Sequence, residues 1–166
     1  MIISDLIGDW SEPARFDVRP VDDETIMKIL DAARLAPSAN NSQIWRFFVV
    51  HDRSLVKQAA ALAGKPAFVG ARTIIAACAQ PWIVAKRSRE QPFFMIDIPI
   101  AISHIILMAQ ELGIGTTVSL DFDESKLLGL IGAPKGYRAV AVIGLGYARR
   151  DGSGGKEMPE DVVRII

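Results

Sequence analysis

The sequence predicts a layered domain of helices and strands, of the α+β or α/β class. Half of the 166 residues are hydrophobic, which is enough for a substantial core. Helical and strand-like hydrophobic patterns alternate along the chain, as they do in layered domains. No repeat, linker or low-complexity tract interrupts them. The length is that of one ordinary domain, so we expect residues 1–166 to form a single domain.

The first half of the chain predicts alternating helices and strands after a short lead-in helix or arm at residues 1–12. Asp22 is a suitable N-cap for a helix whose apolar residues recur at helical spacing. Pro37 is expected to end this helix. Residues 45–50 predict a strand that is apolar enough to be covered on both faces. The next predicted elements are a helix at 54–62 and a strand at 73–79.

The second half begins with a long helix at residues 97–112, apolar around most of its circumference and followed by Gly113 as its C′ residue. Such a helix is expected to be buried, either at the centre of the fold or at a subunit interface. The remaining predicted elements are a strand at 116–120, a helix capped by Asp123 that runs to Leu130, and a last strand at 138–145. The tail, residues 147–166, ends in apolar residues that should pack on this domain or on a neighbour.

Charge and composition exclude several classes of function. The 19 basic and 19 acidic residues balance, which removes the general attraction to nucleic acid and leaves little repulsion between copies. The first ten residues contain no basic residue before an apolar stretch, so they do not form a secretory signal. The apolar run at 73–85 is shorter than the about 20 residues that span a bilayer. We expect a cytoplasmic protein that binds neither nucleic acid nor membranes.

A search by residue type finds no catalytic or metal-binding signature. His51 and His104 are far apart without a carboxylate at ligand spacing, and Cys78 is the sole cysteine, so no metal site is expected. We expect Cys78 to be a small buried hydrophobe and His104 to be a hydrogen-bonded core or interface residue. No nucleophile elbow or complete dinucleotide-binding glycine motif is present. Any reaction should therefore depend on a bound organic cofactor.

The polar loop at residues 36–43 carries the strongest signal for a binding site. It is a surface turn on one interpretation, since Pro, Ser and Asn are common turn residues. On the other, its amides read the edge of a planar heterocycle, because Asn and Gln offer paired donors and acceptors. A flavin and a nucleobase both have such an edge. Core elements on both sides of the loop, with Trp45 at its exit, favour the second interpretation.

Residues 33–47, ARLAPSANNSQIWRF, resemble the A-P-S-x-x-N-x-Q-P-W signature of the nitroreductase family, with Ile44 in place of proline. Segments 15–21, 97–116 and 138–147 are similar to other parts of that family in the same order, so the resemblance covers nearly the whole chain. It implies an α+β homodimer with a mostly antiparallel central sheet and two FMN sites at the subunit interface. The tail at 147–166 would then be an arm that packs on the partner subunit.

The resemblance also implies a set of FMN-binding residues. The loop would lie along the flavin ring and ribityl chain, and residues 118–121 would lie beside the pyrimidine, with a backbone N–H near Asp121 directed at flavin N5. The phosphate would need basic residues, but the family's R-x-S-x-R segment here reads SEPAR, which leaves Arg15. Lys156, or Arg149 and Arg150, would complete the phosphate site. The implied set is Arg15, Pro37, Ser38, Ala39, Asn40, Asn41, Gln43, Val118, Ser119, Leu120, Asp121 and Lys156.

The activity that the resemblance implies is a ping-pong transfer of hydride from NAD(P)H through flavin N5 to an electron-poor acceptor such as a nitroaromatic or a quinone. No side chain is expected to act as a nucleophile. The segment between Cys78 and Asp97 is shorter than in typical members, which predicts a more open pocket. The alternatives are another flavin reaction on the same scaffold (dehalogenation or flavin fragmentation), an FMN- or nucleotide-binding sensor or storage protein, and a structural dimer that has lost its cofactor.

Overall fold

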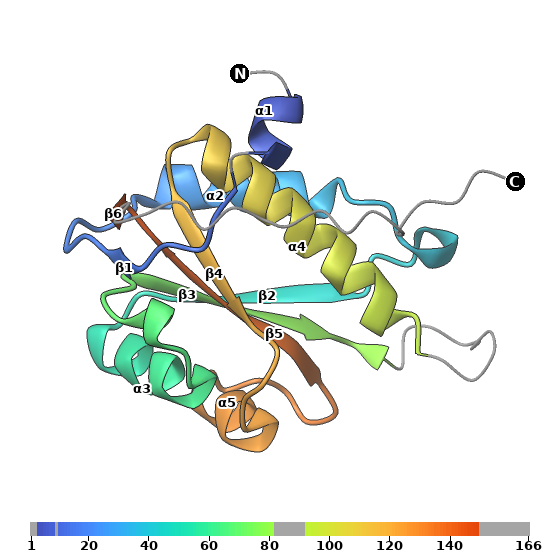
Figure 1. Ribbon diagram of the computed structural model, residues 1–166. Coiled ribbons are helices and arrows are strands. Elements are labelled where there is room, and N and C mark those ends of the chain that lie inside the picture. The colour runs from blue at the N-terminus through green and yellow to red at the C-terminus, as the bar shows by residue number, and fades with distance from the viewer. Residues whose placement is uncertain (1–2, 9, 82–91, 150–166) are drawn as a thin grey trace, which may run out of the picture.

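In the computed structural model, which describes residues 3–8, 10–81 and 92–149, a four-stranded antiparallel sheet lies between two layers of helices (Figure 1). The strand order is β2-β3-β5-β4, and a separate two-stranded ribbon pairs β1 with β6. The elements are α1 (Ile3–Gly8), β1 (Arg15–Phe16), α2 (Asp23–Arg34), η1 (Ala39–Asn41), β2 (Trp45–Val50), α3 (Arg53–Ala63), η2 (Pro66–Phe68), β3 (Thr73–Ala79), α4 (Phe94–Glu111), β4 (Gly115–Ser119), α5 (Glu124–Leu130), β5 (Arg138–Gly146) and β6 (Ala148–Arg149). The predicted α+β class with a mostly antiparallel sheet is confirmed.

The central strand β3 divides the core into two parts. All seven of its residues are buried, and its side chains alternate between the two faces of the sheet. Ile75 and Ala77 pack with α2 and α4, while Ile74 and Ala76 pack with α3 and α5. This two-sided burial explains why the strand is apolar without alternation, and its predicted bounds agree with the structure.

The predicted N-caps Asp22 and Asp123 and the predicted C′ residue Gly113 are also confirmed. Asp22 Oδ1 accepts a hydrogen bond from Thr25 N at 2.8 Å, and Asp123 Oδ1 accepts one from Lys126 N at 3.0 Å. Asp52 caps α3, where it accepts from two backbone N–H groups. Gly113 follows α4 with a φ of 73°, which L side chains rarely adopt.

Strand β2 differs from the prediction because it lies at the edge of the sheet. Its burial is incomplete, and Arg46 within it is exposed. The prediction that residues 45–50 are covered on both faces is confirmed in part: Trp45 and Val49 pack in one core cluster and Phe48 and Val50 in the other, but Arg46 is exposed. An edge strand tolerates a charge that a central strand such as β3 would not.

Helix α4 begins at Phe94, three residues earlier than predicted, and only one of its faces is fully buried. Ile98, Ala101 and Ile105 pack on the sheet and α2, whereas Met95 and Ile96 are about half exposed. His104 Nδ1 lies 3.0 Å from the carbonyl oxygen of Ala32 in α2, as expected for a hydrogen-bonded core residue. By length and composition alone α4 is apolar enough to cross a membrane, a property that it shares with core helices of folded proteins.

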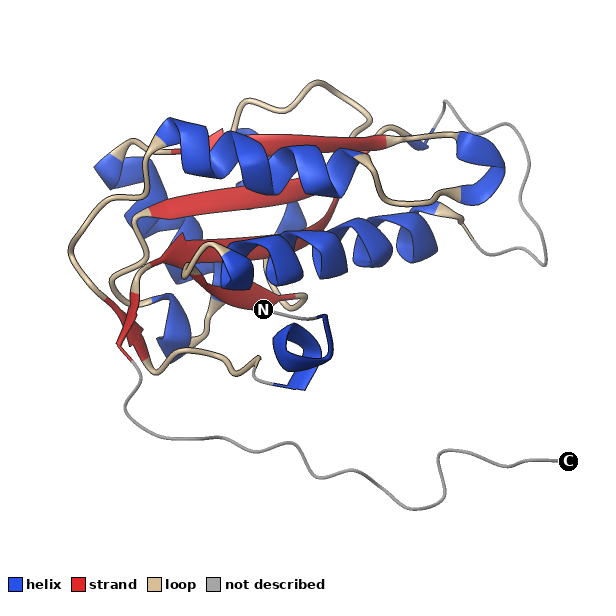
Figure 2. Ribbon diagram, turned by 90° about the horizontal axis from the view of Figure 1, so that it is seen from above, coloured by secondary structure: helices blue, strands red, loops and turns tan. Residues whose placement is uncertain are grey.

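The ribbon of β1 and β6 was not predicted, since two-residue strands leave no periodic pattern. Phe16 of β1 packs where Gly146 leaves room, because a Cβ at Gly146 would lie 2.8 Å from the Phe16 ring. Seen from above, α2 and α4 cover one face of the sheet, and α1 lies on the same side, next to α4 (Figure 2).

Gly144 provides a test of the packing between the sheet and η2. An added Cβ would lie 2.8 Å from Thr117 Cγ2 and 3.0 Å from the Phe68 ring. We expect Gly144→Ala to lower the free energy of unfolding by about 1–3 kcal/mol in urea denaturation, because the site is already filled.

The matched control is Gly129→Ala in α5, where an added Cβ meets nothing within 4 Å. Alanine favours the helix, so this variant should gain about 0.5–1 kcal/mol. Equal effects of the two substitutions would contradict the described packing.

Candidate functional site

The polar loop between α2 and β2 has an unusual backbone. Asn40, Asn41 and Gln43 have φ values of 52°, 54° and 47°, in the left-handed region that non-glycine residues rarely occupy. Asparagine tolerates this region, whereas glutamine does so less readily. Residues held in such conformations cost on the order of 1–3 kcal/mol each and cluster at ligand-binding sites.

A buried carboxylate from the first turn of α4 holds this loop in place. Asp97 is only 1% exposed. Its Oδ1 accepts a hydrogen bond from Ala39 N at 3.0 Å, and its Oδ2 accepts one from the Ser42 hydroxyl at 3.3 Å. Within the loop, Ser38 Oγ accepts from Gln43 N at 3.1 Å. The buried carboxylate of Asp97 thus fixes the turn at both ends, at Ala39 and at Ser42.

With the backbone fixed, the loop presents its amide side chains outward. Asn40, Asn41 and Gln43 are exposed, as is Pro37, while Ser38 and Ala39 are half-buried. Gln43 Nε2 donates to Asn41 Oδ1 at 3.2 Å, which aligns two amides beside each other. The arrangement offers a short row of donors and acceptors to the edge of a flat polar ring.

A second polar cluster joins the N-terminal segment to β4. Lys65 Nζ donates to Glu12 Oε1 at 2.7 Å and to the carbonyl oxygen of Val118 at 2.8 Å. The hydroxyl of Thr117 also donates to Glu12 Oε1. Burial raises the pKa of Glu12, but the hydrogen bonds from Lys65 and Thr117 outweigh burial and lower the pKa overall. Sequence reasoning missed both Glu12 and Lys65 as partners of the segment at 118–121.

Within the segment at 118–121, the two halves differ in exposure. Ser119 is buried, and its hydroxyl donates to the carbonyl oxygen of Ala63 at 2.9 Å. Leu120 is 71% exposed and Asp121 is exposed as well. The first two residues therefore anchor the segment, and the last two are accessible to a ligand.

Arg15 and Arg149 lie directly opposite each other in the ribbon of β1 and β6. Both are exposed, and Arg149 Nε is 3.9 Å from Asp17 Oδ2. Like charges directly opposite on one face destabilise a ladder, and Asp17 places a carboxylate beside this pair. Arg150, Lys156 and the predicted arm beyond Arg149 lie outside the described residues.

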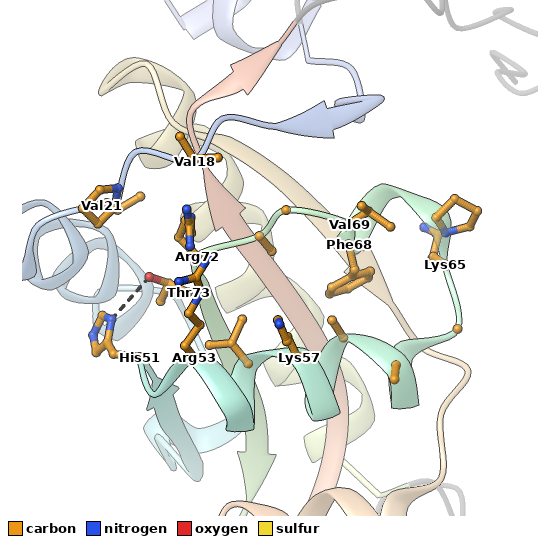
Figure 3. Close-up of a pocket in the computed structure, with 18 residues that line it drawn as sticks. Val18, Val21, His51, Arg53, Lys57, Lys65, Phe68, Val69, Arg72 and Thr73 are labelled. Carbon is orange, nitrogen blue, oxygen red and sulfur yellow. Dashed lines mark hydrogen bonds between the residues drawn. The ribbon is translucent and has the colours of Figure 1, made fainter.

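The two groups of predicted residues do not meet within one chain. Figure 1 shows the loop after α2 beside the start of α4, whereas β4 ends near α5. Gln43 lines a depression of about 630 Å³ with residues of α2 and β2. Lys65, which contacts Val118, also lines a groove of about 1000 Å³ along α3, but none of residues 118–121 lines that groove (Figure 3). The two groups therefore lie apart within one chain.

Cys78 belongs to neither group of predicted site residues. It is fully buried in β3, and burial raises the pKa of its thiol to about 12. This confirms the prediction of a small buried hydrophobe. Within the described ranges, no three His, Cys, Asp or Glu side chains come together as metal ligands.

Comparison with known proteins identifies the family. The model of the nitroreductase family matches residues 15–72 and 57–147, and the chain belongs to this family. A relative from Archaeoglobus fulgidus, provisionally named NADH dehydrogenase/NAD(P)H nitroreductase, is 35% identical over 138 residues, which cover 79% of this chain and 76% of the relative.

Solved structures agree with this assignment. A nitroreductase family protein from Clostridium novyi NT superposes with a TM-score of 0.84 at 27% identity, covering 90% of this chain and 87% of that one. A crystal structure described as an oxidoreductase containing FMN superposes with a TM-score of 0.74 at 23% identity, covering 87% of this chain and 76% of that one. The last similarity concerns the fold.

The contribution of the Glu12–Lys65 pair to stability can be tested by measuring the free energy of unfolding as a function of pH. A depressed pKa in the folded state stabilises the fold above the unfolded pKa of about 4.5, and this stabilisation is lost as the pH falls through the folded pKa. We expect Glu12→Gln to lower the free energy of unfolding at pH 7, and the gap from the wild type to close as the pH falls below about 4.5.

The control is Glu24→Gln, which removes an exposed i,i+4 pair with Lys28 and should have little effect on urea unfolding. A gap between wild type and Glu12→Gln that stays constant down to the acid limit would show that Glu12 is not held as a carboxylate.

Proposed function

We propose that this protein is an FMN-dependent oxidoreductase that takes hydride from NAD(P)H and reduces an electron-poor acceptor such as a nitroaromatic or a quinone. The observation that carries the proposal is the strained loop, whose amides point outward while Asp97 holds its backbone from below. The family, the name of the Archaeoglobus fulgidus relative and the description of an FMN-containing structural neighbour support it.

The loop residues fit the ring of a flavin. The amides of Asn40, Asn41 and Gln43 match the alternating ring nitrogen and carbonyl groups of its polar edge. Ser38 adds a hydroxyl, and Pro37 and Ala39 add small apolar surfaces. Bound FMN would supply the hydride chemistry at N5, and the chain would supply orientation and shielding from water. We place the exposed backbone at Leu120 and Asp121 beside N5.

The phosphate fits the basic ribbon. Arg15 and Arg149 face each other there, and a phosphate between them would offset their repulsion with charge-assisted hydrogen bonds. Lys156 would add a third cation from the segment beyond the ribbon. Lys65 is less suited to this role because Glu12 already pairs with it.

We propose that a homodimer completes the site, with the loop of one subunit facing residues 118–121 and Arg15 of the other. The helical layer of α1, α2 and α4 leaves apolar side chains exposed: Ile3, Ile7, Met27, Met95 and Ile96. Figure 2 shows these helices on one side of the sheet. All five of these exposed apolar side chains belong to one helical layer, which supports this layer as the interface.

The first test is the visible spectrum of protein purified without added cofactor, followed by titration with FMN. We expect flavin bands or saturable uptake, bleaching by NADH or NADPH, and recovery of colour with menadione. A protein that neither carries nor takes up FMN would contradict the proposal. Binding without bleaching by either nicotinamide would indicate the sensor or storage alternative instead.

The residue-level variant is Asn41→Gly, which removes the amide while glycine still accepts the φ of 54°. Loss of one or two hydrogen bonds should weaken FMN binding about tenfold. The control is Gln58→Ala, which removes an exposed amide from α3 and should leave the affinity unchanged.

A further inference from the structure

A groove along α3 has a lining that the proposed function does not use. It lies between α3, the segment at 64–73 and the segment at 18–21, and its volume is about 1000 Å³ (Figure 3). Its apolar lining includes Val18, Val21, Val56, Ala60, Phe68 and Val69. Val18 is 72% exposed and Val69 is 67% exposed, so two apolar side chains at the groove are left in water. The groove therefore offers apolar surface to a ligand.

The charged residues of the groove all have the same sign. Its 18 lining residues include Arg53, Lys57, Lys65 and Arg72, together with His51, and no Asp or Glu. Lys65 is paired with Glu12, but within the described ranges Arg53, Lys57 and Arg72 form no ion pair with a carboxylate.

Arg72 gives a second, independent indication that the groove binds a ligand. Its Nε is buried and has no hydrogen-bond partner among the described residues. A buried donor of a charged group without a partner is costly, and native structures rarely leave one unless a ligand or water completes it. Its backbone N–H is already used, since it donates to the carbonyl oxygen of Leu145 at 3.2 Å.

Two carboxylates near this end of the groove, Asp52 and Asp23, form no ion pair with its arginines or with Lys57 within the described residues. Asp52 Oδ1 accepts hydrogen bonds from Ser54 N and Leu55 N at the start of α3. Asp23 lies 3.5 Å from His51, but its side chain is 90% exposed, where solvent screens its charge. An anion that enters the groove would thus meet net positive charge and an apolar wall together.

We propose that this groove binds a small organic anion with an apolar body, of the acyl or aryl carboxylate class. The carboxylate would pair with Arg53, Lys57 and Arg72, and the apolar body would lie along Ala60 and Val69. The groove lies on the α3 side of the sheet, and none of the described residues assigned to the flavin site lines it, so this site is distinct from the proposed flavin site.

The test is calorimetric titration of the full-length protein, saturated with FMN if it takes up FMN, with decanoate and with decyltrimethylammonium. We expect saturable 1:1 binding of decanoate, weaker at high salt, and no binding of the cation. Arg53→Glu/Lys57→Glu should weaken decanoate binding at least about tenfold. A single charge reversal at an exposed site outside the groove, Lys135→Glu, should not weaken it.

A second variant tests the groove without changing its charge, and it remains informative if Arg53→Glu/Lys57→Glu fails to fold. Ala60→Trp places a large ring in the groove from a half-buried position on α3 and should abolish decanoate binding while the flavin spectrum stays unchanged. Absence of decanoate binding to the wild type, equal binding of the cation, or unchanged binding by Ala60→Trp would overturn the proposal.

Discussion

Asp97 sits in the first turn of α4 with its carboxylate beneath the polar loop, and the shape of that loop depends on its two hydrogen bonds. The loop holds three non-glycine residues at positive φ, which an isolated turn would relax. Asp97 prevents this because it is anchored in turn: α4 packs through Ile98, Ala101 and Ile105 on α2 and the sheet. The conformation of the candidate site is therefore set by the core, not by the loop alone.

The sheet likewise fixes the position of the elements that pack on it. Strand β3 is buried on both faces, so it fixes the α2 and α4 layer on one side and the α3 and α5 layer on the other. The candidate flavin loop lies with the first layer, and the basic groove lies with the second. Two distinct surfaces thus share one rigid support, and a ligand on either side would meet a preformed backbone.

Much of this fold follows from local sequence signals. The spacing of apolar residues predicts the helices, and the caps Asp22 and Asp123 and the glycine at 113 predict their ends, because those interactions join residues close in sequence. The ribbon of Arg15 with Arg149 was not predictable, because it pairs residues far apart in the chain without a periodic pattern. The exposure of Arg46 depends on strand order, which no local pattern specifies.

The candidate site shows the same division. The polar loop is recognisable from its residues, yet its positive φ values and its dependence on Asp97 are tertiary, since 58 positions separate Ala39 from that carboxylate. The contact of Glu12 with Lys65 likewise spans 53 positions. Neither the sequence pattern nor the composition shows that the loop and residues 118–121 lie apart in the folded chain.

The claim on which this account rests is that each flavin site combines the loop of one subunit with Arg15 and residues 118–121 of another. Co-expression of two differently tagged chains, one carrying Asn41→Gly and the other Arg15→Glu, tests it directly through FMN titration of the purified heterodimer. A shared site predicts one site of wild-type affinity per heterodimer, since one site then carries both defects and the other carries neither. If every site lies within one chain, the heterodimer will have no site of wild-type affinity, and the account will be wrong.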